Sequence, residues 1–160
     1  MPIFDDIAGF SAALPGAGTL IGLDPGSKTI GVAASDPNRS IAMPVETIKR
    51  GKFSADAARL ETLITDRGCV GLVVGLPRNM DGSEGPRAQS ARAFARNLER
   101  LGDLPLLMWD ERLSTAAAER DLIAADVSRK KRAQVVDKMA AQFILQGVLD
   151  ALRMQQNDRP

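Results

Sequence analysis

Histidine is absent from this 160-residue sequence, and cysteine occurs once, as Cys69. Catalytic Ser-His-Asp triads, Cys-His pairs and zinc sites built from His and Cys are therefore excluded. A single cysteine cannot form a disulfide within the chain, which agrees with a reducing compartment. Any catalytic chemistry has to come from Asp, Glu, Lys, Arg, Ser, Thr or backbone groups.

Long apolar segments and aromatic residues are also scarce. No run of about 18 apolar residues occurs, so we expect no membrane-spanning helix. The N-terminus lacks the basic start and apolar core of a signal peptide, which predicts a cytoplasmic location. Tyr is absent, but aliphatic residues suffice for one core. The 21 basic and 20 acidic residues nearly cancel, so a nucleic-acid partner would need a local basic patch.

The hydrophobic pattern divides the chain into three parts. Residues 1–18 form an N-terminal extension with a short helix, residues 19–153 form one domain, and residues 154–160 form a C-terminal tail. The expected strands are 19–24, 29–35, 41–48, 69–76 and 104–109, and the expected helices are 53–67, 86–101, about 115–125, and one from the basic run at 129–132 to about 153. Three hairpin-connected strands followed by alternating helices and strands predict an α/β fold with a mixed five-stranded sheet flanked by helices.

Asp24 is the first candidate for chemistry. It ends an apolar strand, on the face occupied by Gly22, directly before the turn Pro25-Gly-Ser-Lys28. Asp-Pro-Gly is also ordinary turn chemistry, so a purely structural role is the alternative. Glycines around a carboxylate leave room for a phosphate to approach the backbone, which favours a functional role.

Asp110 and Glu111 follow a buried strand, at the strand end where open α/β sheets bind ligands. Neighbouring strand residues point to opposite faces, so only one of the two need face a site. Arg112 could pair with either acid in a solvated strand end. The sequence does not distinguish the two acids.

Asp137 is the most informative acid. It shares one helical face with Ala141, Ile144 and Val148, and that face should pack on the sheet. A carboxylate in line with such a face is costly unless it is paired, metal-bound or at the rim of the core. The alternative is a favourable interaction with the helix dipole near the helix start.

Three acids from two strand ends and one helix suit a hard, oxygen-ligated cation. Mg²⁺, or Mn²⁺ in its place, prefers carboxylates together with substrate phosphate and water. Metal ions of this kind activate water and stabilise the leaving oxygen of a phosphodiester. The candidate ligands are Asp24, Asp110, Glu111 and Asp137.

A basic run precedes the Asp137 helix, consisting of Arg129, Lys130, Lys131 and Arg132. Such runs are usually solvated surface, but this one lies near a candidate metal site, which favours phosphate binding. Lys28, in the first turn, and Arg112 are further candidates for nucleic-acid binding.

Four sequence blocks together resemble the YqgF (RuvX) family. They are Leu23-Asp-Pro-Gly-Ser-Lys-Thr-Ile-Gly-Val32, Val74-Gly-Leu-Pro77 with Gly82-Ser83, Asp110-Glu-Arg-Leu-Ser-Thr115, and Val135-Val-Asp-Lys-Met-Ala-Ala141. The family consists of RNase H-like proteins described both as Holliday junction resolvases and as nucleases that mature the 5′ end of the small-subunit rRNA precursor. The resemblance implies a nuclease acting on structured RNA or branched DNA, with ribosomal precursor particles as partners.

The resemblance also assigns roles to the acids. Asp24 corresponds to the first-strand carboxylate of RNase H-like nucleases, and Asp137 to the carboxylate of the C-terminal helix. Related resolvases place a Glu near the fourth strand, where this chain has Gly75-Leu-Pro77. Glu111, or its neighbour Asp110, would take that role here.

Two other functions compete with a nuclease. Actin-like kinases bind nucleotide phosphates with a similar hairpin, but they need two such domains, and one domain is expected here. A non-catalytic nucleic-acid-binding module is the other alternative, and a full set of acids facing phosphates argues against it. The sequence leaves open RNA or branched DNA as the substrate, and a monomer or a homodimer as the oligomeric state.

Overall fold

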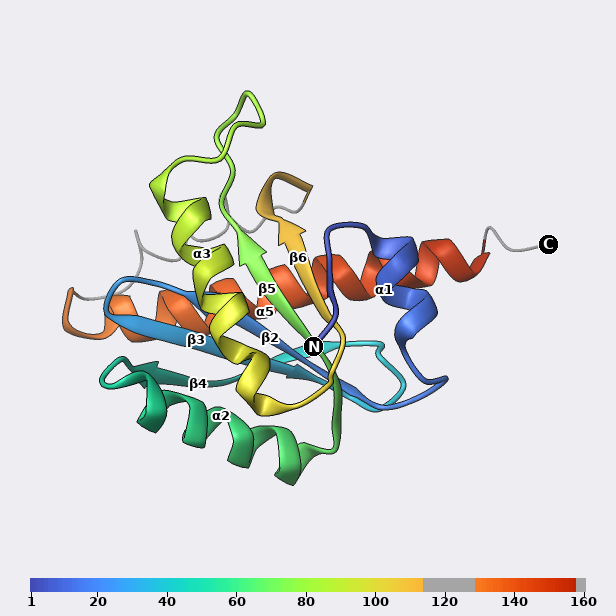
Figure 1. The fold of residues 1–160 in the computed structure, drawn as a ribbon, viewed down its shortest axis with the longest axis horizontal. Helices are drawn as coiled ribbons and strands as arrows, with labels where there is room; N and C mark the ends of the chain where they lie inside the picture. Colours follow the sequence, from blue (N-terminus) through green and yellow to red (C-terminus); the bar gives the residue numbers. More distant parts are fainter. Residues whose placement is uncertain (114–128, 158–160) are drawn as a thin grey trace.

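A six-stranded mixed sheet forms the centre of the molecule (Figure 1). The computed structural model describes the backbone of residues 1–113 and 129–157, and the side chains of residues 1–113 and 138–156. The strands are β1 (Ile3–Phe4), β2 (Thr19–Pro25), β3 (Thr29–Ser35), β4 (Ala42–Lys49), β5 (Cys69–Leu76) and β6 (Leu106–Asp110). Their order across the sheet is β1-β6-β5-β2-β3-β4.

The strand directions confirm the predicted α/β architecture. β2, β3 and β4 are antiparallel neighbours, whereas β5 runs parallel to β2, and β6 runs parallel to β5. The predicted count of five strands was wrong, because β1 adds a sixth. Ile3 of β1 pairs in parallel with Leu106 of β6. A two-residue strand is too short to show an alternating hydrophobic pattern, so nothing in the sequence signalled it.

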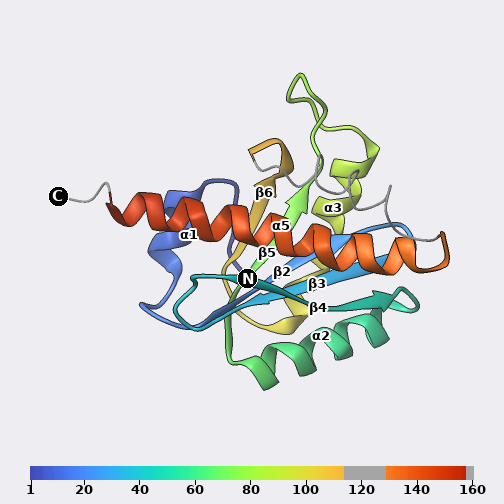
Figure 2. The ribbon, with the colours of Figure 1, turned by 180° about the vertical axis from the view of Figure 1, so that it is seen from behind.

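Helices cover both faces of the sheet (Figure 2). They are α1 (Ile7–Ala13), α2 (Phe53–Arg67), α3 (Pro86–Asn97) and α5 (Arg129–Asn157), with short 3₁₀ turns η1 (Leu98–Leu101) and η2 (Glu111–Leu113). One core lies between the sheet and α2 with α3, and a second lies between the sheet and α5 with α1. No helix in the described part of the chain is long and apolar enough to cross a bilayer.

Local chemistry ends several elements where the sequence predicts. Gly68 closes α2 in the left-handed conformation at φ 59°, and its N–H donates to the Ile64 and Thr65 carbonyls. Pro86 starts α3, where a missing N–H costs least. Pro44 lies on the edge strand β4, next to a shift in register, because Pro cannot donate to a regular ladder.

The N-terminal 18 residues are packed into the domain rather than set apart from it. Phe10 of α1 is fully buried, and Asp6 caps the helix by accepting from the Gly9 N–H at 2.7 Å. A Cβ at Gly71 of β5 would lie 2.7 Å from Leu14 Cδ2, which shows how closely this segment covers the sheet. The segment therefore contributes a strand, a helix and part of a core.

The C-terminal helix is longer than the sequence analysis expected. α5 begins at Arg129, so the basic run forms its first turn, and it continues to Asn157. Leu152 near its end is buried at 7 % exposure. Residues 154–157 thus belong to the helix and not to a tail. The helix expected at about 115–125 lies outside the described residues.

The burial of Phe10 generates a test of the N-terminal segment. We expect Phe10→Ala to lower the free energy of unfolding by about 3–5 kcal/mol, because it removes a fully buried ring from a packed core. Ile41→Ala is the control, since Ile41 is 54 % exposed. Chemical denaturation measures both. Equal, small effects would show that residues 1–18 do not pack on the domain.

Candidate functional site

The carboxyl ends of β2, β5 and β6 meet at one edge of the sheet, because these strands run parallel. Ligands of open α/β sheets bind at this edge. Two nearly buried acidic side chains lie there, Asp24 at 9 % exposure and Glu111 at 8 %. They form the centre of the candidate site.

Asp24 faces the side of the sheet that α5 covers. Residues two apart on a strand share a face, and Gly22 is in contact with α5. A Cβ at Gly22 would lie 2.8 Å from Leu145 Cβ and 3.2 Å from the Ala141 carbonyl oxygen. Gly22 therefore lets α5 cross β2 closely, and Asp24 comes next on that face. Its partner on β3 is Gly31, which places no side chain beside the carboxylate.

Glu111 begins the η2 turn directly after β6, and its carboxylate lies over β5. A Cβ at Gly75 of β5 would come within 2.7 Å of both Glu111 Oε1 and Ile144 Cδ1. The missing side chain at Gly75 is therefore what makes room for the Glu111 carboxylate beneath α5. No pattern in the sequence indicated this role of Gly75.

Gly75 also connects the two acids. Leu23 pairs with Val74 in the β2–β5 register, so Asp24 and Gly75 are neighbours across the two strands. Asp24 and Glu111 thus flank the same space on the α5 face. Related resolvases place a Glu near the fourth strand, where this chain has Gly75-Leu-Pro77. In this structure a carboxylate from the end of β6 occupies the space over that glycine.

Asp110 forms ion pairs with two arginines. Its Oδ2 accepts from Arg112 Nη2 at 2.7 Å, and Arg78 Nη1 lies 3.7 Å away. Alternation along β6 directs Asp110 to the face opposite the one that Trp109 shares with α5. The bonded Arg112 guanidinium holds the pKa of the Asp110 carboxyl below its usual range. The structure therefore separates Asp110 from Asp24 and Glu111, which the sequence could not do.

Asp137 lies within α5, and its side chain is outside the described residues. The helix begins at Arg129, eight residues earlier, so the position is past the second turn. A helix dipole stabilises a negative charge only within the first turn, which removes the dipole as the explanation for this acid. Ala141, one turn further along α5, contacts β2 at Gly22. The first turns of α5 lie at the hairpin end of β2 and β3, where Asp24 is (Figure 2).

An ion-pair network holds the segment between β5 and α3. Arg92 of α3 donates to Glu84 at 2.8 Å and to Asp5 at 3.0 Å, and Arg78 approaches Glu84 at 3.4 Å. The pKa of Glu84 is lowered by the bonded Arg92. Arg112 is tied to this segment as well, through the Met80 carbonyl. Arg92 and Arg112 therefore hold the backbone of the segment between β5 and α3 in place. The sequence analysis did not assign this role to them.

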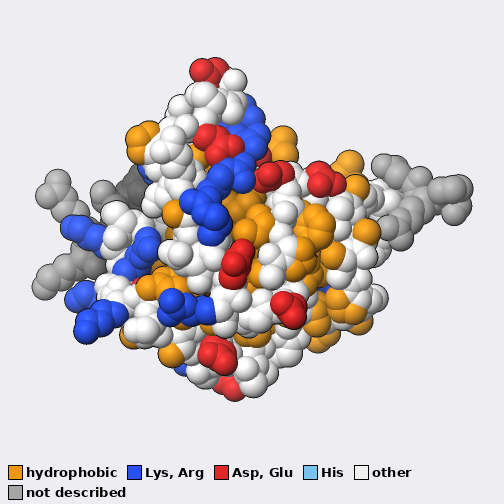
Figure 3. Space-filling view, viewed as in Figure 1, with side chains coloured by type: hydrophobic (Ala, Val, Ile, Leu, Met, Phe, Trp, Pro, Cys, Tyr) orange, Lys and Arg blue, Asp and Glu red, His pale blue; other side chains and the backbone are white. Residues whose placement is uncertain are grey.

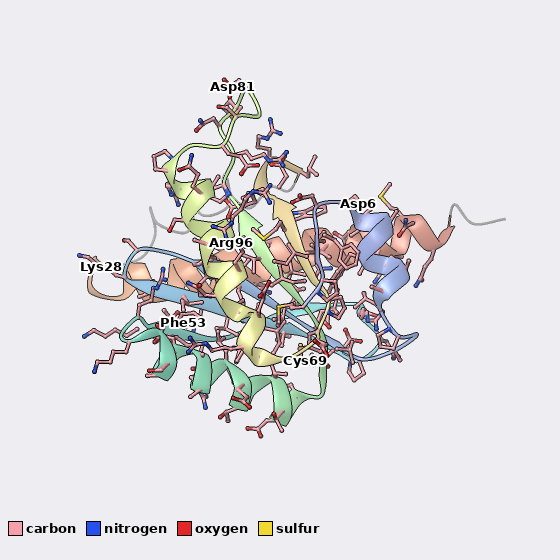
Figure 4. The ribbon with its side chains drawn as sticks, in the orientation of Figure 1. Asp6, Lys28, Phe53, Cys69, Asp81 and Arg96 are labelled. Atoms are coloured by element: carbon pink, nitrogen blue, oxygen red, sulfur yellow. The ribbon has the colours of Figure 1, made fainter. Side chains whose placement is uncertain are left out.

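The basic candidates are distributed unevenly. Lys28 lies at the tip of the β2–β3 hairpin and is exposed (Figure 4). Arg112, the other single candidate, is paired with Asp110. The side chains of Arg129, Lys130, Lys131 and Arg132 lie outside the described residues, so their phosphate contacts stay a prediction.

The residues present fit a hard cation. Among the described side chains, no three carboxylate, His or Cys groups come together as a metal-binding cluster. Asp24 and Glu111 supply oxygen donors on both sides of the space above Gly75, and the third predicted donor, Asp137, is outside that set. Carboxylate oxygens without nitrogen or sulfur ligands are the donors that Mg²⁺ prefers.

Comparison with known proteins gives consistent matches. Residues 18–151 match the model of a family described as RuvX: Holliday junction resolvase. A protein of Cereibacter sphaeroides named "Putative pre-16S rRNA nuclease" is 65% identical over 94% of both chains. A protein of the same name from Paracoccus denitrificans is 62% identical, covering 94% of this chain and 96% of its own.

A solved structure supports the fold. T. thermophilus RuvC in complex with Holliday junction substrate aligns with a TM-score of 0.51 at 11% identity, covering 86% of this chain and 96% of RuvC. A likeness at that identity shows the fold alone, and the fold is RNase H-like, as predicted. The family match over residues 18–151 confirms the resemblance carried by the four sequence blocks.

The glycine contacts generate a test of the site's construction. We expect Gly22→Ala to destabilise most, because its Cβ would meet backbone and a stiff Cβ atom of α5. Gly75→Ala should cost about 1–3 kcal/mol of unfolding free energy, since only the ends of Glu111 and Ile144 must shift. Gly51→Ala is the control, with nothing within 4 Å. Thermal and chemical unfolding give the order, and three equal values would contradict close packing of α5.

Proposed function

The chain belongs to the RuvX family, and on this basis we propose that it is a metal-dependent nuclease that matures the 5′ end of the pre-16S rRNA. The two relatives above carry the name of a pre-16S rRNA nuclease and match this chain along nearly its whole length. The observation that supports the chemistry is the pair of nearly buried carboxylates, Asp24 and Glu111, around the space above Gly75.

Asp24, Glu111 and Asp137 would hold the cation. A bound Mg²⁺ or Mn²⁺ supplies an activated water and stabilises the leaving oxygen of a phosphodiester. Asp24 and Glu111 each lie under 10 % exposed, and low local dielectric strengthens the attraction between such carboxylates and a cation. With no His in the chain, no imidazole acts as general base. The acids therefore serve to position the cation and the attacking water.

Glu111 is the better candidate than Asp110 for the second acid. Glu111 shares the α5 face with Asp24, while the charge of Asp110 is balanced by Arg112 and Arg78. Asp110 instead anchors the turn after β6, because it also accepts from the Arg112 backbone N–H at 3.0 Å.

Branched DNA is the second candidate substrate, since the matching family is described as Holliday junction resolvases. A homodimer would suit a two-fold symmetric junction, and a monomer would suffice for trimming RNA. Ribosomal precursor particles are the partners that the first candidate implies. Cleavage of pre-16S rRNA and of a four-way DNA junction, side by side, distinguishes the two.

The acid roles predict a clear division among four variants. Asp24→Asn, Glu111→Gln and Asp137→Asn should each slow cleavage of pre-16S rRNA by about 100-fold or more, because each removes charge that holds the cation. All three substitutions are nearly isosteric, so folding and substrate binding should persist. Gel assays with labelled RNA and Mg²⁺ measure the rates.

Asp110→Asn is the matched control. It should keep the cleavage rate and lose about 1 kcal/mol of unfolding free energy, because it weakens the partly exposed ion pair with Arg112. Parental cleavage by Glu111→Gln together with inactive Asp110→Asn would reverse the assignment. Parental cleavage rates in all four variants would place the catalytic groups elsewhere in the chain, and RNA binding by the parent without any cleavage would leave only a nucleic-acid-binding module.

Metal binding should also appear as stability. If Asp24 and Glu111 hold a cation, Mg²⁺ or Mn²⁺ at ten times its dissociation constant should stabilise the fold by about 1.4 kcal/mol. Asp24→Asn should lose most of that gain, and the exposed Asp66→Asn on α2 should keep it. Melting temperatures across a metal titration measure the effect. The same gain in both variants would place the cation elsewhere.

A further inference from the structure

A groove of about 590 Å³ opens at the edge of the sheet where β2 and β5 end. One wall is the β2–β3 turn with Gly26, Ser27 and Lys28, and the other is the first turns of α3 with Arg87 and Ser90. Pro25 and Pro77, which also line it, lie at the ends of β2 and β5. This hairpin groove therefore lies at the same strand ends as the acidic pair, on the side of the sheet that α3 covers.

The hairpin wall is held in place from below. The turn is closed by the Gly26 N–H donating to the Thr29 carbonyl at 2.8 Å, and the Arg50 N–H donates to the Lys28 carbonyl at 2.9 Å. The Arg50 guanidinium donates to the Gly26 carbonyl and stacks 5.5 Å above the Phe94 ring. These contacts use the carbonyl groups of the turn and fix its backbone. A ligand in the groove would meet a preformed wall.

The charged side chains that line the hairpin groove are all positive. Its lining includes Lys28 and Arg87 and no carboxylate. Within the described part of the chain, neither cation takes part in an ion pair, whereas Arg59, Arg78, Arg92 and Arg112 are all paired with acids. Figure 3 shows Lys and Arg side chains gathered at the end of the molecule where the hairpin lies. Two unpaired cations around a cavity favour an anionic ligand.

We propose that the hairpin groove binds a phosphate of the nucleic-acid strand next to the bond that is cut. Lys28 and Arg87 would contact the phosphate oxygens, and the hydroxyl groups of Ser27 and Ser90 can donate to them. The inference rests on the proposed nuclease function, and it adds a path for the strand from the acidic pair over the hairpin turn. The phosphate is either an internal phosphodiester or a terminal phosphate.

Binding of short single-stranded RNA tests the groove. The double variant Lys28→Ala/Arg87→Ala should bind the RNA about tenfold more weakly than the parent at low salt. The slope of its log affinity against log salt should be smaller by about 0.7 for each phosphate that is no longer neutralised. Both side chains are exposed, so the melting temperature should not change. Fluorescence anisotropy in chelator measures affinity without cleavage.

Two controls accompany this variant. Arg67→Ala removes an exposed cation at the end of α2, outside the groove, and should keep the parental slope. Lys28→Arg/Arg87→Lys keeps both charges and should keep most of the affinity. Oligonucleotides with 5′-phosphate and 5′-hydroxyl ends distinguish the two phosphate sources: an equal loss of affinity with both indicates an internal phosphodiester, and a loss with the first alone indicates a terminal phosphate.

The failures of the two proposals differ. A parental affinity and slope in Lys28→Ala/Arg87→Ala, with RNA cleavage by the parent intact, would overturn the groove alone. The same loss of affinity in Arg67→Ala would overturn it too, since any surface cation would then serve. No RNA binding and no cleavage by the parent would overturn both the groove and the nuclease.

Discussion

The close crossing of α5 over the sheet is the constraint on which the candidate site depends. Two glycines permit it: a Cβ at Gly22 would meet α5 at 2.8 Å, and a Cβ at Gly75 would meet Ile144 and Glu111 at 2.7 Å. Larger residues at these positions would push the helix outward and fill the space that the Glu111 carboxylate occupies. The same packing that closes the second core therefore sets the position of the acids.

The charges at the strand ends are divided between the two faces of the sheet. On the α5 face, Asp24 and Glu111 lie nearly buried on either side of Gly75. On the other face, Asp110 and Glu84 are neutralised by arginines that also fix the segment between β5 and α3. Arg78, Arg92 and Arg112 thus pair with acids on that face. The ion pairs on that face give structural support to the segment between β5 and α3.

The sequence predicted those parts that rest on local patterns. The apolar run 69–76 predicted a strand, because a strand buried on both faces needs no alternation of apolar and polar residues. The structure has β5 at the same residues. The two-residue β1 carried no pattern. The choice between Asp110 and Glu111 also depended on information outside the local sequence, namely where β6 ends and which face each residue then takes. In the sequence, Gly75 was noted only because related resolvases have a Glu near this position. Its role, which is to leave room for the Glu111 carboxylate, depends on the end of β6 lying above β5.

The aromatic residues limit how a strand could be recognised. The chain has five Phe, one Trp and no Tyr. All six belong to the two cores, where they are buried or half-buried. Base stacking on exposed aromatic rings is the usual sequence-tolerant contact with single strands, and this protein has no such ring to offer. A strand bound at the acidic pair and the hairpin groove would be held by its phosphates. Selection among substrates would then depend on the path of the backbone, which differs between folded RNA and branched DNA.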